Sequence, residues 1–484
     1  MIITAVQIEK GDDRTLLSEL ESILGSGSVA TTTAERLVYE TDAFTVAKRR
    51  PAAVVHPKTT SEVQAVVRLA NQRGIPFVAR GAGTGLSGGA LVAPGGILIN
   101  ISSMREILSV DLRNRRVTAQ AGVVNLKLTQ HVASDKYQFA PDPSSQMACT
   151  LGGNVAENAG GPHTLKYGVT TNHLLGIKMV LPDGEILDIP GSVDENVGYD
   201  LLGLIAGSEG TFGIITEVTV KLTRLPQAKW TALAVFPTIR DATQCVSDII
   251  SAGILPAALE MIDKTAIQTV EAAFGFGFPL DAGAVLIIEL DGLEAGLAEQ
   301  GSRVNNICLK NNASEVRVAA DEDERMNLWL ARKKAVGTLG RIAPSHCTQD
   351  GVVPRSKLPE VSAAINAKVA EYGLKIANIF HAGDGSLHPI LLFDERDPEQ
   401  VAQVMECGEE ILKICIAAGG AITGEHGVGI EKMDFMPLMF SEADIETMSR
   451  VKLAFNTNNL CNPDKILPTR AGCTELLLLK KGVH

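Results

Sequence analysis

Two histidines in this chain are spaced as a pair of metal ligands would be. His381 and His388 flank Asp384-Gly385, a dipeptide favoured in two-residue β-hairpin turns, and apolar runs lie on both sides. Counting outward from that turn pairs the two histidines directly across a hairpin, on one face, with Cβ atoms about 4.5–5.5 Å apart. The alternative is a pair of core or loop histidines. We favour the metal-binding pair, because this separation suits two imidazoles that hold one ion.

A third ligand is offered by Glu425, which stands directly before His426 in the segment GEHGVG. Two imidazoles and one carboxylate, with a coordination position left open, are the ligands of a catalytic zinc site. Manganese or ferrous iron accepts the same ligands, so zinc is preferred without excluding them. A bound ion lowers the pKa of a coordinated hydroxyl group. His426, whose ordinary pKa is near neutrality, suits the role of the general base that takes the proton of that hydroxyl group.

The first glycine-rich passage, RGAGTGLSGG from Arg80 to Gly89, follows a predicted strand and contains G-x-G-x-x-G. In a nicotinamide-binding Rossmann domain, a helix opens at the third glycine and points its N-terminus at the pyrophosphate. Here the chain continues ALVAPGG into another strand, and Pro94 with two glycines disfavours that helix. A tight connection between strands is the alternative. Because the glycines leave many backbone N–H groups open, we predict an anion-binding loop outside a Rossmann domain.

Two more glycine-rich passages follow at strand ends. They are TLGGNVAENAGG over 150–161, which comes after PDPS at 141–144, and GSEGTFGIITE over 207–217. In order and spacing, the three passages resemble the FAD-binding domain of the vanillyl-alcohol-oxidase-type (PCMH-type) flavoproteins, and the resemblance covers nearly the whole chain. It implies that the first loop holds the FAD pyrophosphate and that the other two line the adenosine and the isoalloxazine. Some members attach the flavin to a histidine of the first loop, and the lack of one here implies non-covalent FAD.

A closing segment, NLCNPDK over 459–465, is similar to the N-P-x-K stretch with which the family returns to its FAD domain. A simple terminal turn is the equal alternative. The residues that the resemblance assigns to FAD are Arg80, Gly81, Ala82, Gly83, Thr84, Gly85, Leu86, Ser87, Gly88, Pro141, Asp142, Pro143, Thr150, Gly152, Gly153, Asn154, Ala159, Gly160, Gly161, Gly207, Gly210, Thr211, Gly213, Ile214, Ile215 and Asn459.

The motifs HxGDGxxH and GEHG are similar to those of the metal-containing 2-hydroxy-acid branch of this family. That branch includes D-lactate and D-2-hydroxyglutarate dehydrogenases and, with the strongest likeness, the catalytic flavoprotein subunits of bacterial glycolate oxidases. The resemblance implies that His381, His388 and Glu425 bind the metal and that His426 is the base. It also implies a D-2-hydroxy acid as substrate, with hydride transfer to flavin N5.

An anionic substrate needs a local cation, because the formal net charge of -12 cannot attract it. Arg332, in LWLARKK, falls where the relatives bind the substrate carboxylate, and a bidentate contact suits it. For Lys333 and Lys334 a solvated patch on a helix is an equal alternative. Hydroxyglutarate enzymes carry a second cation where this chain has Thr348, and an asparagine where it has Ile390. Both differences favour lactate or glycolate over a dicarboxylate.

Other functions stay open: a D-2-hydroxyglutarate-type dehydrogenase, a redox-neutral FAD enzyme such as an ether-lipid synthase, and a non-catalytic flavin subunit of a larger complex. The eight cysteines contain no CxxC pair, so the chain has no iron–sulfur signature of its own. We therefore expect an external electron acceptor, namely a quinone, a cytochrome or an iron–sulfur partner subunit. The acidic charge disfavours a nucleic-acid partner. A homodimer is left open.

The elements that must position these residues follow from hydrophobic patterns. The first half alternates strands and helices, with strands near 52–55, 75–79, 96–101, 116–121, 176–181 and 213–222 and a capped helix over 60–72. From Trp230 the pattern restarts as strand, helix and strand. We expect an α+β chain whose PCMH-type FAD-binding domain, built of two α+β subdomains, covers 1–226. An α+β cap or substrate domain with an antiparallel sheet and the metal site then covers 227–432, and a helical segment over 433–484 packs back on the FAD domain.

The chain also carries signals about its location. No apolar stretch reaches the roughly 18 residues that a membrane helix needs, and the N-terminus is unlike a signal peptide. Scattered cysteines in so long a chain are typical of a reducing compartment. We therefore expect a cytoplasmic protein without a transmembrane segment. The tail ELLLLKKGVH favours the last turns of a docked helix, with peripheral membrane contact as the alternative.

Overall fold

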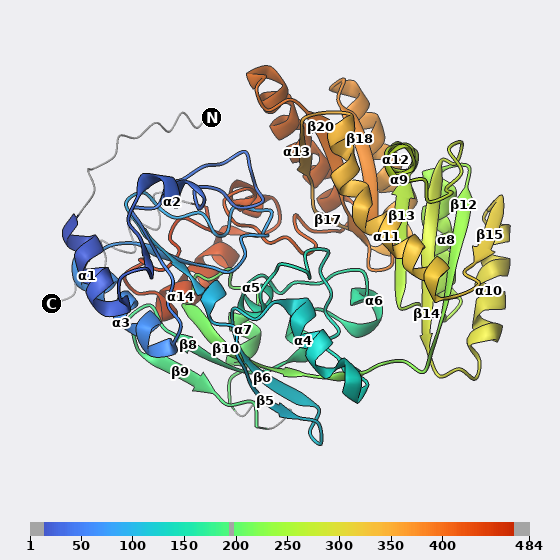
Figure 1. Cartoon of the computed structure of the whole chain (residues 1–484). Coiled ribbons are helices and arrows are strands. Elements are labelled where there is room, and N and C mark those ends of the chain that lie inside the picture. The colour runs from blue at the N-terminus through green and yellow to red at the C-terminus, as the bar shows by residue number, and fades with distance from the viewer. Residues whose placement is uncertain (1–13, 193–197, 469–484) are drawn as a thin grey trace.

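The computed structural model of the chain describes residues 14–192 and 198–468 (Figure 1). Within these two ranges, no helix combines the length and the apolar character that crossing a lipid bilayer requires. The predictions for the first residues of the chain and for the tail ELLLLKKGVH lie outside the described residues.

A small sheet with strand order β1-β2-β4-β3 begins the fold, and its last three strands run parallel. Its strands are β1 (Val29–Ala30), β2 (Ala53–Val55), β3 (Phe77–Arg80) and β4 (Ile97–Asn100). The crossover helix α3 (Thr60–Arg73) starts at Thr59, whose side chain accepts from the N–H of Glu62, and ends at Gly74 in the left-handed conformation. This strand–helix–strand unit was predicted, and it delivers the first glycine-rich passage at the end of β3.

A second, antiparallel sheet has the order β5-β6-β10-β8-β9. Its strands are β5 (Ile107–Asp111), β6 (Arg116–Gln120), β8 (Leu174–Val180), β9 (Ile186–Ile189) and β10 (Ile214–Lys221). The smaller elements around both sheets are α1 (Arg14–Leu24), α2 (Thr33–Leu37), α4 (Asn125–Val132), α5 (Leu151–Glu157), α6 (Thr164–Tyr167), α7 (Leu201–Ile205), β7 (Tyr137–Gln138), β11 (Thr223–Arg224), η1 (Ile101–Ser103), η2 (Ala133–Asp135) and η3 (Thr170–His173). Both sheets share one apolar core, as expected for two subdomains of one FAD-binding unit.

The third sheet is antiparallel, with the order β15-β12-β14-β13-β18-β19-β17, and β16 and β20 pair beside it. Its strands are β12 (Ala228–Phe236), β13 (Ala258–Asp263), β14 (Ala284–Gly292), β15 (Glu315–Val318), β16 (Ser345–Thr348), β17 (Gly351–Val352), β18 (Lys375–His381), β19 (Ser386–Leu387) and β20 (Pro389–Phe393). Its helices are α8 (Ile239–Ser251), α9 (Lys264–Phe274), α10 (Leu297–Lys310), α11 (Glu322–Thr338), α12 (Leu358–Glu371) and α13 (Pro398–Ala417), with the short turns η4 (Leu339–Arg341) and η5 (Arg355–Lys357).

Helices cover this sheet on both faces, because successive strand residues point to opposite sides. Leu286 and Ile288 pack with α8, α10, α12 and α13, whereas Val285 and Ile287 pack with α9 and α11. Figure 1 shows this layered unit beside the FAD-binding part. The face under α11 is the one that carries the chemistry described below.

The chain then returns to the FAD-binding part through η6 (Met433–Leu438) and α14 (Glu442–Phe455), drawn in red in Figure 1. Phe455 stacks on Phe212 with ring centroids 4.6 Å apart, and Cys461 pairs with Phe77 beside β3. The predicted fold class is confirmed, including the antiparallel sheet of the second unit and the returning helical segment. The domain boundaries at 226 and 432 stay a prediction.

Candidate active site

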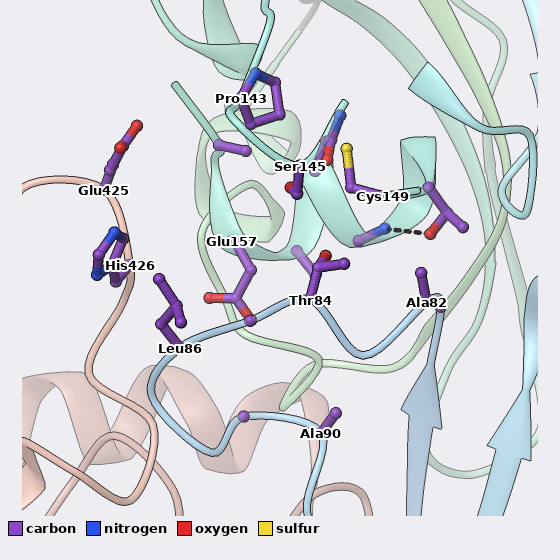
Figure 2. Close-up of a pocket in the computed structure, with 18 of the residues that line it drawn as sticks. Ala82, Thr84, Leu86, Ala90, Pro143, Ser145, Cys149, Glu157, Glu425 and His426 are labelled. Atoms are coloured by element: carbon purple, nitrogen blue, oxygen red, sulfur yellow. Dashed lines mark hydrogen bonds between the residues drawn. The ribbon is translucent and has the colours of Figure 1, made fainter. Parts of the chain in front are cut away.

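A single cavity runs from the glycine-rich loops to the predicted metal ligands, between the two large parts of the fold. Figure 2 shows Leu86 and Thr84 of the first loop on either side of Glu157, with Glu425 and His426 on the side of Leu86. No helix forms over residues 81–96, which agrees with the rejection of a Rossmann domain. The cavity therefore joins a long, glycine-lined channel to a cluster of ionisable side chains.

Most residues that were predicted to bind FAD line this cavity. They are Arg80, Gly81, Ala82, Gly83, Thr84, Gly85, Leu86, Pro143, Thr150, Gly152, Gly153, Asn154, Ala159, Gly160, Gly210, Gly213 and Ile215. The other predicted residues do not line it; they are Ser87, Gly88, Pro141, Asp142, Gly161, Gly207, Thr211, Ile214 and Asn459. Lining residues that the sequence analysis missed include Ser145, Cys149, Glu157, Ser208 and Glu209. These lie inside or beside the three passages, so proximity to a glycine-rich passage was the available signal.

Close contacts of the first passage explain two of its glycines, one against the second passage and one against Arg80. A Cβ at Gly81 would lie 2.2 Å from Oγ1 of Thr150. Thr150 is needed there, because its side chain caps α5 by accepting from the N–H of Gly153 at 3.4 Å. Gly83 has φ +70, and a Cβ would collide with the Arg80 guanidinium, 2.2 Å from its Nη2. The wall of the channel is thus main chain, as a bound dinucleotide requires.

The histidine hairpin differs from its prediction in register. His381 lies opposite Ser386, and Asn378 lies opposite Pro389, so His381 and His388 are not directly paired. The connection is a four-residue loop over 382–385, with a positive φ at Gly385. A two-residue type I′ turn would also need a positive φ at Asp384. A slip of two residues keeps each side chain on its face, so the rings still meet, with centroids 5.1 Å apart.

Glu425 completes a group of three ligand atoms with these histidines. Its Oε1 lies 3.2 Å from Nε2 of His381 and 3.6 Å from Nε2 of His388. Ligand atoms that share a zinc ion at about 2.1 Å lie roughly 3–3.5 Å apart, so this spacing fits one ion. Within the described residues, Nε2 of His388 is buried and has no hydrogen-bond partner. An orphaned buried imidazole nitrogen that faces a carboxylate is what a metal site without its ion presents.

The pKa values of Glu425 and His426 agree with their proposed roles, whereas the carboxylates of Glu260 and Glu425 raise the pKa of His381 although burial opposes that shift. Burial alone would raise the pKa of Glu425, but His381 and His388 lower it to about 2. Glu425 is therefore a carboxylate at neutral pH, as a metal ligand must be. Burial lowers the pKa of His426 to about 4, although Asp350 opposes that shift. The ring of His426, which stacks on His388 with centroids 4.8 Å apart, is neutral at pH 7 and can accept a proton.

Glu260, on β13, is a functional candidate that the sequence analysis missed. It is fully buried, and its carboxylate accepts from Nδ1 of His381 at 2.8 Å. It also pairs with Nη2 of Arg332 at 2.8 Å. A carboxylate on the far nitrogen of a ligating histidine fixes the tautomer that leaves the near nitrogen free for a metal. An acid inside the apolar run ALEMID was the available signal.

Arg332 lines the cavity from α11 while being 95% buried, since 5% of it is exposed. One edge of its guanidinium faces Glu260, and Nε has no hydrogen-bond partner in the described part of the chain. Donors therefore remain for a ligand carboxylate. Lys333 also lines the cavity, although it is exposed, whereas Lys334 lies over the ring of Phe274 at 4.5 Å.

The two parts of the fold meet at a second buried cluster, beside α11. Glu289, on β14, is fully buried and accepts from Nε1 of Trp329 at 2.7 Å. His163, from the FAD-binding part, stacks on Trp329 and lies between Asp142 at 2.8 Å and Glu289 at 3.5 Å. Burial alone would lower the pKa of His163, but Asp142 and Glu289 raise it to about 10. Asp142, which was predicted to bind FAD, therefore contributes to the contact between the two parts of the fold.

Two family descriptions match the chain: the FAD binding domain over residues 51–190 and the C-terminal domain of FAD linked oxidases over residues 225–466. The chain is 44% identical to the glycolate oxidase subunit GlcD of Escherichia coli (strain K12), over 96% of its own length and 93% of that protein. It is 30% identical to the mitochondrial D-lactate dehydrogenase [cytochrome] of Arabidopsis thaliana, over 94% of its own length and 80% of that protein.

Solved structures show the same fold at low identity. p-Cresol methylhydroxylase with substrate bound superposes with a TM-score of 0.78 at 16% identity, over 95% of this chain and 97% of that one. Alkyldihydroxyacetonephosphate synthase superposes with a TM-score of 0.75 at 19% identity, over 96% of this chain and 88% of that one. From the two domain matches and the relatives that share nearly its whole length, the chain is an FAD-dependent oxidoreductase and belongs to the FAD-linked oxidases.

Proposed function

We propose that this chain oxidises a small D-2-hydroxy acid, D-lactate or glycolate, to the corresponding 2-oxo acid, with non-covalent FAD as the first electron acceptor. The observation that carries the proposal is the meeting of His426, Arg332 and the His381–His388–Glu425 cluster at one end of the glycine-lined cavity. The names of the relatives, glycolate oxidase subunits and D-lactate dehydrogenases, support the same substrate class. The D stereochemistry rests on that likeness.

The reaction removes a hydroxyl proton and a hydride from one carbon, so the site needs a base and a hold on the carboxylate. FAD, when bound, supplies the acceptor of the hydride. His426 takes the hydroxyl proton on its neutral ring, which burial keeps unprotonated at pH 7. Arg332 binds the substrate carboxylate through N–H groups that Glu260 does not occupy. The two groups together orient the carbon–hydrogen bond toward the channel.

We also propose a divalent metal ion, zinc in preference to manganese or iron, held by His381, His388 and Glu425. The orphaned Nε2 of His388 and the ligand spacing support this assignment. A bound ion would supply Lewis acidity to the substrate hydroxyl. Glu260 would orient His381 through Nδ1, as carboxylates do behind metal-binding histidines.

The walls of the substrate end support a monocarboxylate. Thr348 and Ile390 both line the cavity, and neither side chain carries a charge. His346 lines it as well, and burial lowers the pKa of His346, so this ring is neutral at pH 7. Lys333 also lines the cavity, but it lies at an exposed position of α11. Burying a second carboxylate without a buried cation beside it costs free energy, and lactate and glycolate, with one carboxylate each, avoid that cost.

The test is anaerobic reduction of the bound flavin. Purified protein is mixed in turn with D-lactate, glycolate, D-2-hydroxyglutarate and, as a stereochemical control, L-lactate, and the long-wavelength flavin absorbance is followed. We expect bleaching by D-lactate or glycolate, slower bleaching by the dicarboxylate, and loss of bleaching after dialysis against a chelator. A flavin that stays oxidised with every acid would overturn the proposal and favour a redox-neutral use of FAD.

Electrons must then leave the reduced flavin, and we propose an external quinone, cytochrome or iron–sulfur partner subunit as their acceptor. GlcD is named a subunit, which supports a multi-subunit enzyme. The described cysteines are all free and buried, so they offer no cluster site at the surface. Reoxidation of substrate-reduced protein by a soluble quinone, by cytochrome c and by oxygen would rank the acceptors.

A further inference from the structure

The loop that carries Glu425 and His426 presents five consecutive backbone N–H groups, at residues 425–429, and each donates to a side-chain oxygen. Glu425 and His426 donate to Asp350 at 3.1 and 3.0 Å. Gly427 donates to Oγ1 of Thr423 at 3.0 Å. The N–H groups of residues 428 and 429 donate to the two carboxylate oxygens of Glu209, at 2.7 and 2.6 Å. Adjacent N–H groups that converge on an anion form a nest, and this loop contains two.

The two carboxylates come from different parts of the fold. Asp350 lies between β16 and β17 in the sheet that carries the histidines, and it is fully buried. Glu209 belongs to the third glycine-rich passage, lines the cavity and is 6% exposed. The loop is therefore bonded at its first half to the substrate domain and at its second half to the FAD-binding part.

Each carboxylate is itself held firmly. Asp350 accepts from Oγ1 of Thr423 at 2.6 Å and from Nζ of the buried Lys432 at 3.1 Å. Lys432 also donates to the carbonyl of Gly427 at 3.3 Å, which closes the loop on itself. Glu209 has φ +50, a left-handed backbone that a glutamate adopts only where its surroundings hold it. The strain at Glu209 is offset by the two short hydrogen bonds that its oxygens accept, at 2.7 and 2.6 Å.

A glycine completes the arrangement. A Cβ at Gly427 would lie 2.9 Å from Oε1 of Glu209 and 2.7 Å from Oε2 of Glu157. Gly427 also has φ +83, so the chain can bend between the two nests there. The bend lets one short loop face a carboxylate of each domain.

We propose that Asp350 and Glu209 are positioning residues that fix Glu425 and His426 against the cavity from two sides. The proposal rests on the function proposed above for Glu425 and His426. Asp350 binds the N–H groups of Glu425 and His426 themselves, and Glu209 binds those of residues 428 and 429 in the same loop. Losing one carboxylate therefore moves the proposed metal ligand and base together. A misplacement of about 1 Å at a reacting group costs roughly 100-fold in rate.

The test compares Asp350→Asn and Glu209→Gln with the wild type. Each change keeps the shape of the side chain but replaces one acceptor oxygen by an NH₂ group that cannot accept from the loop. We expect the anaerobic rate of flavin reduction to fall about 10- to 100-fold in both variants, with little change in the substrate concentration at half-saturation, because Arg332 is unaffected. FAD content and the flavin spectrum should stay as in the wild type. Glu209→Asp, which keeps both oxygens, should recover part of the rate.

A double-mutant comparison separates positioning from general destabilisation. On a His426→Ala background, Asp350→Asn should slow flavin reduction by a much smaller factor than it does in the wild type, because its target is already gone. The control is Asp291→Asn. Asp291 is a buried residue whose carboxylate accepts from Nζ of Lys166 and from the hydroxyl of Tyr167 across the same domain boundary. This variant should lose thermal stability and keep its rate.

The proposal is overturned if Asp350→Asn and Glu209→Gln reduce their flavin at the wild-type rate, or if Asp291→Asn is slowed as much as they are. Should no hydroxy acid reduce the wild type, the proposed function fails. Retention of zinc after dialysis then still tests the positioning role of the two carboxylates, because Asp350→Asn should lose zinc sooner than Asp291→Asn. If Asp350→Asn does not fold, Thr423→Val removes two bonds of the same nest without leaving a buried charge unpaired.

Discussion

The two ends of the cavity are built from different parts of the polypeptide. At the FAD end the wall is main chain, and glycines stand where a Cβ would strike a neighbouring passage, as at Gly81. At the reacting end the wall is made of ionisable side chains, and one of them is oriented by another, since Glu260 orients His381. The first end recognises its ligand by shape and N–H groups, and the second acts through charge. Mutations should therefore affect cofactor binding and chemistry separately.

The largest effect should come from His426→Ala, which removes the proposed base and leaves the glycine wall intact. We expect flavin reduction by substrate to slow by about 10²–10⁴-fold, the usual range for loss of a general base. FAD content should be unchanged, because the contacts of the channel lie in other segments. Rapid-mixing absorbance measures the rate, and denaturation followed by flavin absorbance measures the content. Turnover close to that of the wild type would contradict the assignment.

A smaller effect is expected from Glu260→Gln, which weakens the support of His381 and of Arg332 together. Loss of a carboxylate behind a metal-binding histidine lowers metal affinity by about 10- to 100-fold. The substrate concentration at half-saturation should rise as well, because Arg332 loses its partner. Metal analysis after dialysis against graded chelator measures the first effect. If FAD were lost in place of the metal, the two ends would not be independent.

The reverse experiment is Gly81→Ala, directed at the main-chain wall. The new Cβ would sit 2.2 Å from Oγ1 of Thr150, so the first two passages must move apart. A strain of about 1–2 kcal/mol corresponds to roughly a tenfold weaker FAD complex, measured by titrating the apoprotein with FAD. Metal content should not change. Gly340→Ala is the matched control, because a Cβ there has nothing within 4 Å. Equal FAD affinity in both variants would show that the wall tolerates side chains.

The smallest effect concerns the contact between the two parts of the fold. The pKa of His163 rises from 6.5 to about 10 on folding. A raised folded-state pKa stabilises the fold fully below pH 6.5, and this stabilisation disappears as the pH rises through about 10. The melting temperature of wild type should therefore exceed that of His163→Gln by an amount that shrinks between these pH values. A difference that is constant with pH would show that His163 does not titrate with folding.

Much of the fold was predictable because its signals are local. Capping at Thr59, the restart of the pattern at Trp230 and the unbroken glycine passages each lie within a few residues. The His381–His388 pair was predicted on the correct face but in the wrong register, because the side-chain period of two does not distinguish a two-residue turn from a four-residue loop.

The supports of the reacting end could not be predicted in this way. Glu260 meets His381 from 121 residues away, and Glu209 meets Val428 from 219 residues away. Such pairs depend on which strands become neighbours. A single sequence does not show which distant residue an acid inside a strand will contact. Asn459 was assigned to FAD from its segment, but it does not line the cavity. Its neighbour Asn462 instead donates to the carbonyls of Gly89 and Glu209 and so connects two glycine-rich passages.

The stacking of Trp329 on a protonated His163 has an optical consequence. Trp329 is one of two tryptophans in the chain, and its ring lies 5.4 Å from an imidazole that belongs to the other part of the fold. A protonated imidazole in van der Waals contact quenches indole fluorescence. The emission of Trp329 thus reports, without any attached label, whether the two parts are joined. With Trp230 replaced by phenylalanine, the protein would carry a single tryptophan, placed at the contact between the two parts of the fold.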